Sequence, residues 1–324
     1  MSRPREDGIV IGTLEPGPRN SIADVGVTVG HVTVERTGVT AVVPPTLPAP
    51  AGTAVLNGAG ELTGSLEIRE WGGLGTPVYL TSTHAVGRVY DGAVSVAMAA
   101  DPGVGVDRVV IPVVGECDDS WLSDARVAHV QPDDVARAAA DASFDFGQGA
   151  VGAGAGMVCF DWKGGIGSSS RRAGEHTVGV LLLTNFGSSE QLRVDGVPVG
   201  ELLDERPEEA PDLGGSCSAV LATDAPLTPP QLERLARRAG LGLARAGSVA
   251  HHGSGEIFVA FAASVERSFP DRELNPLFQA AVDATEEAVL CSLWAAVDTT
   301  GREGRLVRAL PHEKVLDLYR GRGR

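Results

Sequence analysis

Ser216 follows two glycines, Gly214 and Gly215, where an acidic, proline-containing loop meets an apolar run. A serine hydroxyl is a poor nucleophile until a neighbouring group takes its proton. If the Gly215–Ser216 bond were cut, Ser216 would carry a free α-amino group beside its own hydroxyl. Such amines titrate at about 7.7–8.0, close to working pH, which suits a general base. The same letters also fit an ordinary loop that leads into a strand.

A second pair of chemically capable residues is Ser254 and Glu256, in the stretch HHGSGEIFVAF. Residues two apart at the start of a strand point to one face, so the hydroxyl and the carboxylate are expected to be neighbours. A carboxylate bonded to a hydroxyl can orient or pass a proton for a nucleophile. Because GSGE is also typical of a turn with an exposed acid, the pair matters only if the fold brings it to Ser216.

Short apolar runs separated by turn residues predict the strands that must position these groups, and several runs are continuous enough to be buried on both faces. One helical pattern begins with Thr228 as N-cap, Pro229 at the first position and Gln231 completing a capping box. The segment 201–215 is the best linker candidate. The predicted strands cover 25–34, 37–44, 76–83, 107–116, 176–185, 216–224 and 255–264; the predicted helices cover 131–144, 228–247 and 275–297, the last capped by Asn275.

The order of these elements brings the candidate residues to one edge of a sheet. The strands that start at Ser216 and near Glu256 are joined by one amphipathic helix, a crossover that usually makes two strands parallel. Asn185 ends the preceding strand, and it reaches the same edge if that strand runs the other way. An amide donor is what an oxyanion hole requires. A hydroxyl, a hydroxyl–carboxylate pair and an amide together fit acyl transfer.

Composition narrows the class of protein. The 324 residues carry a net charge of -15, which disfavours nucleic acid and anionic membrane surfaces as partners and suits small cationic substrates. The four cysteines are scattered without a CxxC pair, which is typical of reduced thiols in a cytosolic enzyme. The N-terminus has no signal-peptide pattern. We expect a cytoplasmic α/β protein with layered sheets and helices.

Three weaker signals predict no chemistry of their own. The run GAGAGM (152–157) imitates a dinucleotide-binding motif but lacks the following helix and acid, so close backbone packing is the better interpretation. Cys217 is expected to point away from the Ser216 face as a small buried side chain. The histidines His84, His251 and His252 lack metal-site spacing, so no metal or other cofactor is expected.

At these residues the chain resembles the family of L-aminopeptidase/D-Ala-esterase/amidase (DmpA) and β-aminopeptidases, which are self-processing N-terminal-nucleophile hydrolases. The resemblance covers nearly the whole chain in order. It implies a four-layer α/β/β/α sandwich, with residues 1–324 as one domain that cuts itself into an α chain of 1–215 and a β chain of 216–324. It also implies a homo-oligomer of αβ units. The matching segments are GGSCSAVLATDAPL, LARAGSVAHHGSGEIFVAF, NSIADVGVTVGH, LNGAGELTGSLEIREWGGLGTPVYLTSTHAVG, VGAGAGMVCFDWKGGIGSSSR and LLLTNFG.

The same resemblance implies the roles of individual residues. Ser216 matches the nucleophile, and Ser254 and Glu256 match the family's catalytic serine and glutamate. Asn185, in TNFG, matches the asparagine that stabilises the oxyanion.

Substrate binding is implied for Glu116, which matches a glutamate proposed to hold the substrate's ammonium group. Asp118 departs from the family, which often has a tyrosine there whose hydroxyl serves the oxyanion. An ionised carboxylate deepens cation attraction but donates no hydrogen bond, so the substrate preference inside the family stays open.

The resemblance implies an aminopeptidase or amidase that releases N-terminal residues (L-α, D-Ala or β) from short peptides, amides or esters with a free amino group. Two alternatives stay open. One is a related acyltransferase or amide-oligomer hydrolase of the same fold, although those enzymes cut themselves before threonine. The other is an uncleaved, non-catalytic binding protein.

Overall fold

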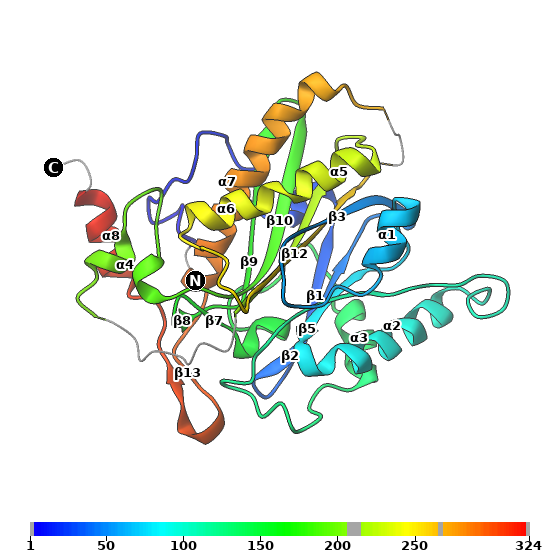
Figure 1. The fold of residues 1–324 in the computed structure, drawn as a ribbon, viewed down its shortest axis with the longest axis horizontal. Helices are drawn as coiled ribbons and strands as arrows, with labels where there is room; N and C mark the ends of the chain where they lie inside the picture. The colour runs from blue at the N-terminus through cyan, green and yellow to red at the C-terminus, as the bar shows by residue number, and fades with distance from the viewer. Residues whose placement is uncertain (1–2, 206–214, 265–267, 322–324) are drawn as a thin grey trace.

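The computed structural model describes residues 3–205, 215–264 and 268–321, so part of the predicted linker lies outside the described residues. Two β-sheets stack face to face at its centre (Figure 1). Helices cover the outer face of each sheet.

The larger sheet has six strands in the order β4-β3-β12-β11-β10-β9. Strands β11 and β12 are parallel, and the other neighbours that pair in this sheet are antiparallel. The two central strands, β12 and β11, come late in the chain and are flanked on both sides by strands from the first 185 residues. The strands are β3 (Ala49–Gly58), β4 (Gly73–Leu74), β9 (Ile166–Ala173), β10 (His176–Asn185), β11 (Ser216–Thr223) and β12 (Gly255–Ala262).

The smaller sheet has four strands in the order β1-β2-β5-β6. Its last pair, β5 and β6, is parallel, and the others are antiparallel. Two short hairpins, β7–β8 and β13–β14, lie outside the large sheets. These strands are β1 (Thr28–Val34), β2 (Thr37–Val43), β5 (Val78–Ser82), β6 (Val113–Cys117), β7 (Val158–Cys159), β8 (Trp162–Lys163), β13 (Thr299–Thr300) and β14 (Leu306–Val307).

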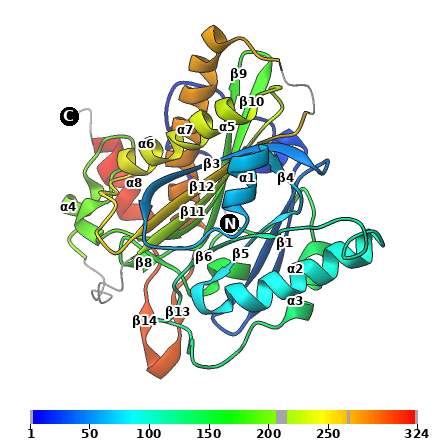
Figure 2. The same cartoon turned by 45° about the vertical axis from the view of Figure 1, so that its right-hand side comes forward.

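The helices form the two outer layers, as the turned view in Figure 2 makes plain. Helices α5, α6 and α7 lie on the six-stranded side, and α2 and α3 lie on the four-stranded side. None of the described helices is long and apolar enough to cross a lipid bilayer. The α-helices are α1 (Ser65–Trp71), α2 (Val86–Ala100), α3 (Pro132–Ala140), α4 (Val199–Leu202), α5 (Pro229–Ala236), α6 (Arg238–Arg245), α7 (Leu274–Trp294) and α8 (His312–Gly321); the 3₁₀ turns are η1 (Ile22–Val25), η2 (Thr83–Ala85), η3 (Gly152–Gly156), η4 (Ser189–Gln191), η5 (Asp271–Glu273) and η6 (Arg302–Gly304).

Three hydrophobic cores fill the spaces between these four layers. One lies between the six-stranded sheet and α5–α7, one between the two sheets, and one between the four-stranded sheet and α2–α3. Strand β11 shows how the pattern arises: Ala219 and Leu221 enter the first core while Val220 and Ala222 enter the second, because successive side chains alternate between faces. The predicted four-layer α/β/β/α sandwich is confirmed.

Several predicted boundaries were wrong. The helix predicted over 228–247 is two helices, α5 and α6, that meet at Arg237, although its Thr228–Gln231 capping box is present. Helix α7 begins at Leu274 after Glu273, so Asn275 is inside the helix and does not cap it. Helix α3 ends at Ala140 because Asp141 and the following turn pair with β1.

The parallel pairing of β11 and β12 brings the predicted site residues to one edge of the six-stranded sheet. Helices α5 and α6 carry the chain back across the sheet, so both strands start at the same edge. Strand β10 is antiparallel to β11 and therefore ends there. Both predictions about strand direction are confirmed.

Candidate active site

Ser216 is the first residue of β11 and lies between the end of β10 and the start of β12. Its Cα pairs with Asn185, the last residue of β10, and with Gly255, the first residue of β12. Gly255 stands between Ser254 and Glu256 in the chain, so the register brings all four site residues to one point of the sheet edge. Ser216 is buried, with 6% of its surface exposed to solvent.

Ser254 and Glu256 form the predicted hydroxyl–carboxylate pair. The Ser254 hydroxyl donates a hydrogen bond to Oε1 of Glu256, and both side chains are buried. Burial raises the pKa of the Glu256 carboxyl, and the hydrogen bond from Ser254 opposes that rise. The second carboxylate oxygen, Oε2, is buried with no hydrogen-bond partner among the described residues. A buried oxygen in this position is a strong acceptor for an incoming N–H or O–H.

Gly215 is tightly packed, and a side chain there would press on its neighbours. A Cβ added there would lie 3.0 Å from the carbonyl oxygen of Asn185 and 3.1 Å from Cα of Phe186. The carbonyl of Gly215 accepts a hydrogen bond from the backbone N–H of Gly255 at 3.2 Å. The carbonyl just before Ser216 is therefore already polarised by a backbone donor.

Asn185 is held by both ends of its amide. Its Oδ1 accepts from the backbone N–H of Val158 at 2.9 Å, and its Nδ2 donates to the backbone carbonyl of Asp118 at 2.9 Å. The Val158 donor fixes which end is the NH₂ group, since only the oxygen can accept. An NH₂ group has two hydrogens, so one remains for an oxyanion.

Glu116 reaches the edge from the other sheet. It lies on β6, and Ser218 of β11 donates a side-chain hydrogen bond to its backbone carbonyl at 3.0 Å, which ties the two sheets together. The carboxylate accepts from the backbone N–H of Glu61 at 2.9 Å and from the hydroxyl of Thr83. Burial raises the pKa of Glu116, and these two donors oppose the rise.

Asp118 contributes to the edge through its backbone. Its carboxylate accepts hydrogen bonds from both the backbone N–H and the hydroxyl of Ser120, each at 2.9 Å. The side chain is thus closed into a local turn, while its carbonyl holds Asn185. Binding of a substrate cation by this carboxylate stays a prediction.

Sequence reasoning missed three residues that hold the site: Glu61, Thr83 and Val158. Each acts across at least 27 positions of sequence on the side chain that it contacts. Two of them act through backbone N–H groups, which leave no mark on residue type. The only available signal was the position of all three residues inside segments with family resemblance.

The alternative reactive groups are accounted for. Cys217 faces the core between sheet and helices, and burial raises the pKa of its thiol well above the ordinary value, so a thiolate is disfavoured. The ring of His251 contacts the side-chain amide of Gln191 at 3.0 Å, while its backbone carbonyl accepts from Asn57. His84 is exposed in η2.

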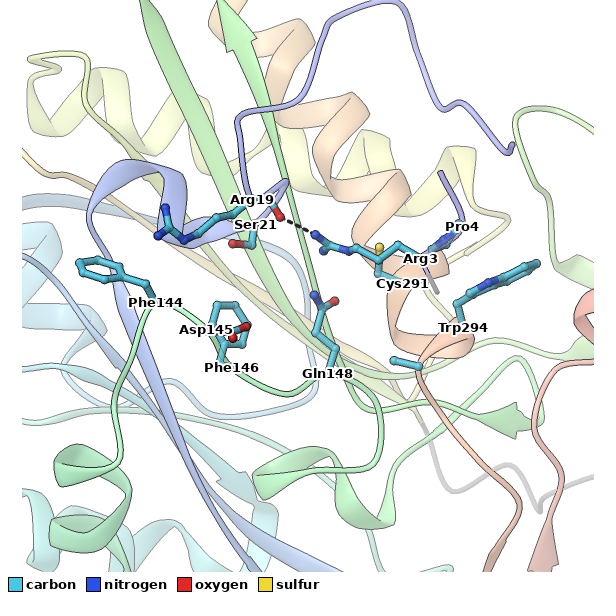
Figure 3. A pocket seen from close by; sticks show the side chains of 11 residues that line it. Arg3, Pro4, Arg19, Ser21, Phe144, Asp145, Phe146, Gln148, Cys291 and Trp294 are labelled. Carbon is cyan, nitrogen blue, oxygen red and sulfur yellow. Dashed lines mark hydrogen bonds between the residues drawn. The ribbon is translucent and has the colours of Figure 1, made fainter. Parts of the chain in front are cut away.

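A cavity of about 720 Å³ lies elsewhere, between the N-terminal segment, the loop before η3 and the end of α7 (Figure 3). It is lined by Cys291, whose thiol pKa is raised to about 12 by burial, and by Ser21, whose hydroxyl accepts a hydrogen bond from the backbone N–H of Ala23 at 3.3 Å. The Arg3 guanidinium is engaged with backbone carbonyls, and the Arg19 guanidinium lies over Phe144. This cavity pairs no nucleophile with a base, so the Ser216 edge is the candidate active site.

Comparison with known proteins supports a single identification. The model of a protein family, Peptidase family S58, matches residues 20–307. The chain is 40% identical over 360 aligned residues to beta-peptidyl aminopeptidase BapA of Sphingosinicella microcystinivorans, which covers 94% of this chain and 90% of the relative.

Solved structures agree with the sequence comparison. A beta-aminopeptidase of Burkholderia sp. superposes with a TM-score of 0.92 at 40% identity and covers 98% of both chains. The L-aminopeptidase D-Ala-esterase/amidase of Ochrobactrum anthropi superposes with a TM-score of 0.92 at 34% identity, over 100% of this chain and 99% of that one. That enzyme is a prototype of the serine aminopeptidases and a variant of the Ntn hydrolase fold.

Proposed function

The chain belongs to Peptidase family S58, and we propose that it is a self-processing serine aminopeptidase that releases N-terminal residues from short peptides, amides or esters. The observation that carries the proposal is the register that sets Ser216 between Asn185 and the Ser254–Glu256 pair. The relatives named for β-peptides make a β-amino acid the first substrate class to examine.

The first reaction is the cut that creates the nucleophile. Oγ of Ser216 attacks the carbonyl carbon of Gly215, and the carbon–nitrogen bond breaks. The nitrogen takes the hydroxyl proton, which leaves Gly215 joined to Oγ as an ester. Water hydrolyses this ester, so Gly215 becomes a carboxylate and Ser216 regains its hydroxyl. The Gly255 N–H that bonds the Gly215 carbonyl would stabilise the negative oxygen of this step.

The second reaction is turnover of substrate. The free α-amino group of Ser216 takes the hydroxyl proton while Oγ attacks the substrate carbonyl. The unpartnered Oε2 of Glu256 would accept a hydrogen bond from that amino group and favour its protonated form. The leaving amine takes the proton, and water then releases the acyl group from Oγ.

Two further side chains complete the site. Asn185 supplies its free N–H to the oxyanion, and Glu116 pairs with the ammonium group of the substrate, which aligns the first carbonyl with Ser216. A cytoplasmic location and assembly into oligomers of αβ units stay predictions.

The proposal is tested by intact-mass measurement together with a substrate panel. The purified protein should separate under denaturing conditions into fragments of 215 residues and 109 residues (324 − 215), the second starting with Ser216. A panel of p-nitroanilides of L-Ala, D-Ala and β-Ala should show release of nitroaniline from at least one. An intact chain that turns over none of them would refute the proposal.

Glu116→Gln is expected to weaken substrate binding more than catalysis. Losing a charge-assisted bond to an ammonium costs about 1.5–3 kcal/mol, so KM should rise roughly 10- to 100-fold with kcat nearly kept. In the unmodified enzyme KM should also rise as pH falls, because burial raises the pKa of Glu116 and protonation removes its charge. This rise should begin above the pH at which an ordinary carboxyl titrates.

Steady-state kinetics from pH 4.5 to 8 on the L-Ala, D-Ala or β-Ala substrate check both points. Glu61→Gln is the matched control, since it keeps the backbone N–H that bonds Glu116 and removes only a nearby side-chain charge that raises the pKa of Glu116. A KM that is the same in Glu116→Gln as in the unmodified enzyme would remove Glu116 from substrate binding.

A further inference from the structure

Lys163 is a fully buried lysine that the proposed reaction does not use. The chain has two lysines, and the other, Lys314, is exposed and paired with Glu205. The Lys163 ammonium donates to three backbone carbonyls, those of Gly154 at 3.0 Å, Met157 at 2.7 Å and Gly164 at 2.9 Å. These bonds replace a carboxylate partner, since the structure gives Lys163 no ion pair within the described ranges.

Two of these carbonyls, those of Gly154 and Met157, belong to the glycine-rich run 152–157. The run forms η3, which packs tightly enough that a Cβ on Gly154 would lie 2.6 Å from the carbonyl oxygen of Gly149. The Gly154 carbonyl also accepts a hydrogen bond from the backbone N–H of Met157, and the Met157 carbonyl accepts one from that of Gly164, each at 3.3 Å. The bonds from Lys163 to these two carbonyls are shorter and charge-assisted. Lys163 satisfies the carbonyls at both ends of the turn that leads out of η3.

The residue that follows this turn holds the proposed oxyanion donor. The Met157 carbonyl receives the shortest of the three bonds from Lys163, and the N–H of the same peptide group, that of Val158, donates to Oδ1 of Asn185. Val158 is also paired with Lys163 across the β7–β8 hairpin. We propose that Lys163 is a positioning residue that fixes the Met157–Val158 peptide and thereby aims the amide of Asn185.

The geometry explains why this position holds a lysine, although nearly all other basic residues of the chain are arginines. An ammonium group offers three hydrogens in a compact pyramid, which suits three carbonyls around one point. A guanidinium is planar and wider, so arginine cannot make the same three bonds. Burial lowers the pKa of Lys163 to about 7, while the nearby Asp119 opposes this change. Cys159 also favours the charged form, and Arg36 disfavours it.

The inference rests on the proposed role of Asn185, so the experiment separates the two. Asn185→Ala alone tests that role and should lower kcat about 10²- to 10³-fold, as loss of an oxyanion donor does. Lys163→Met should lower kcat roughly 10-fold or more with KM within about twofold, because a misaimed donor affects the transition state more than substrate binding. Rates are expressed per cut chain, as counted by intact mass.

The decisive variant is the double replacement Lys163→Met/Asn185→Ala. If Lys163 acts through Asn185, the double variant should match Asn185→Ala within about twofold, since the two effects are then not additive. Lys314→Met is the matched control and should keep the unmodified kcat. Lys163→Gln keeps two N–H donors, and it replaces Lys163→Met throughout if the latter does not fold.

Two outcomes would overturn the inference while leaving the proposed function intact. The first is unmodified kcat in the Lys163 variant. The second is an equal loss on replacing Lys163 with or without Asn185, which would mean that the lysine supports the fold in general. If Asn185→Ala itself keeps full kcat, the oxyanion role of Asn185 fails instead.

Discussion

Ser216→Ala is expected to give a single uncut chain of 33.4 kDa with no measurable aminopeptidase turnover. Alanine has no hydroxyl to attack the Gly215 carbonyl, so neither the cut nor the acyl-enzyme can form. Removal of a serine nucleophile lowers kcat by orders of magnitude even when binding is intact, and we expect a loss of at least about 10⁴-fold. Denaturing electrophoresis and a p-nitroanilide assay measure both effects together.

Two neighbouring variants make the result specific. Cys217→Ala should cut itself and turn over substrate normally, because that thiol lies in the core on the opposite face of β11. Ser216→Cys should retain some self-cutting, since a thiol can attack the same carbonyl. Full-length Ser216→Ala protein with unmodified activity would show that another residue is the nucleophile.

Glu256→Gln is expected to lower kcat by about 10²- to 10⁴-fold, the usual range for loss of a proton-transferring group. Glutamine has one side-chain oxygen where glutamate has two, and its NH₂ group only donates hydrogen bonds. It therefore cannot accept one bond at each position, from the Ser254 hydroxyl and from the N-terminal ammonium of Ser216. Self-cutting should slow as well, which a time course of intact mass would record. The change keeps the volume of the side chain, so packing should be little affected.

Glu286→Gln is the control for burial. Glu286 lies on α7 away from the site, is 2% exposed, and burial raises its pKa to about 7. If both replacements lower kcat equally, the loss reflects disturbance of a buried carboxylate rather than proton transfer at Ser216. Thermal melting of both variants supplies the comparison of stability.

The strand pattern could be predicted where side chains alone decide burial. The run 176–185 is apolar over most of its length, and β10 has those bounds. Strand β9 was missed because its sequence, IGSSSRRA, looks exposed. Its serines and Arg171 are buried, and the N-terminal segment and α7 supply hydrogen-bond partners to them, as in the bond from Arg171 to Glu287. Such partners are far away in sequence and cannot be inferred from the strand itself.

The candidate site was predictable where it depends on neighbouring positions in one strand or on the connection between two successive strands. Ser254 and Glu256 bond to each other because two positions on one strand share a face, and Ser216 meets them because a single crossover makes β11 and β12 parallel. The support of Asn185 was not predictable, because it comes from a backbone N–H and a backbone carbonyl of two separate segments. The sequence pattern therefore predicts which candidate side chains lie together more readily than it predicts the backbone groups that orient them.

The position of β12 and β11 in the middle of the six-stranded sheet decides what the proposed cut does to the molecule. The two chains produced by the cut would stay hydrogen-bonded in one sheet, since β11 pairs with β10 and β12 pairs with β3. A cut enzyme that has once unfolded would have to reassemble from two polypeptides, and its recovery would then depend on their concentration. The stability of the cut protein would therefore depend on its rate of unfolding rather than on its ability to refold.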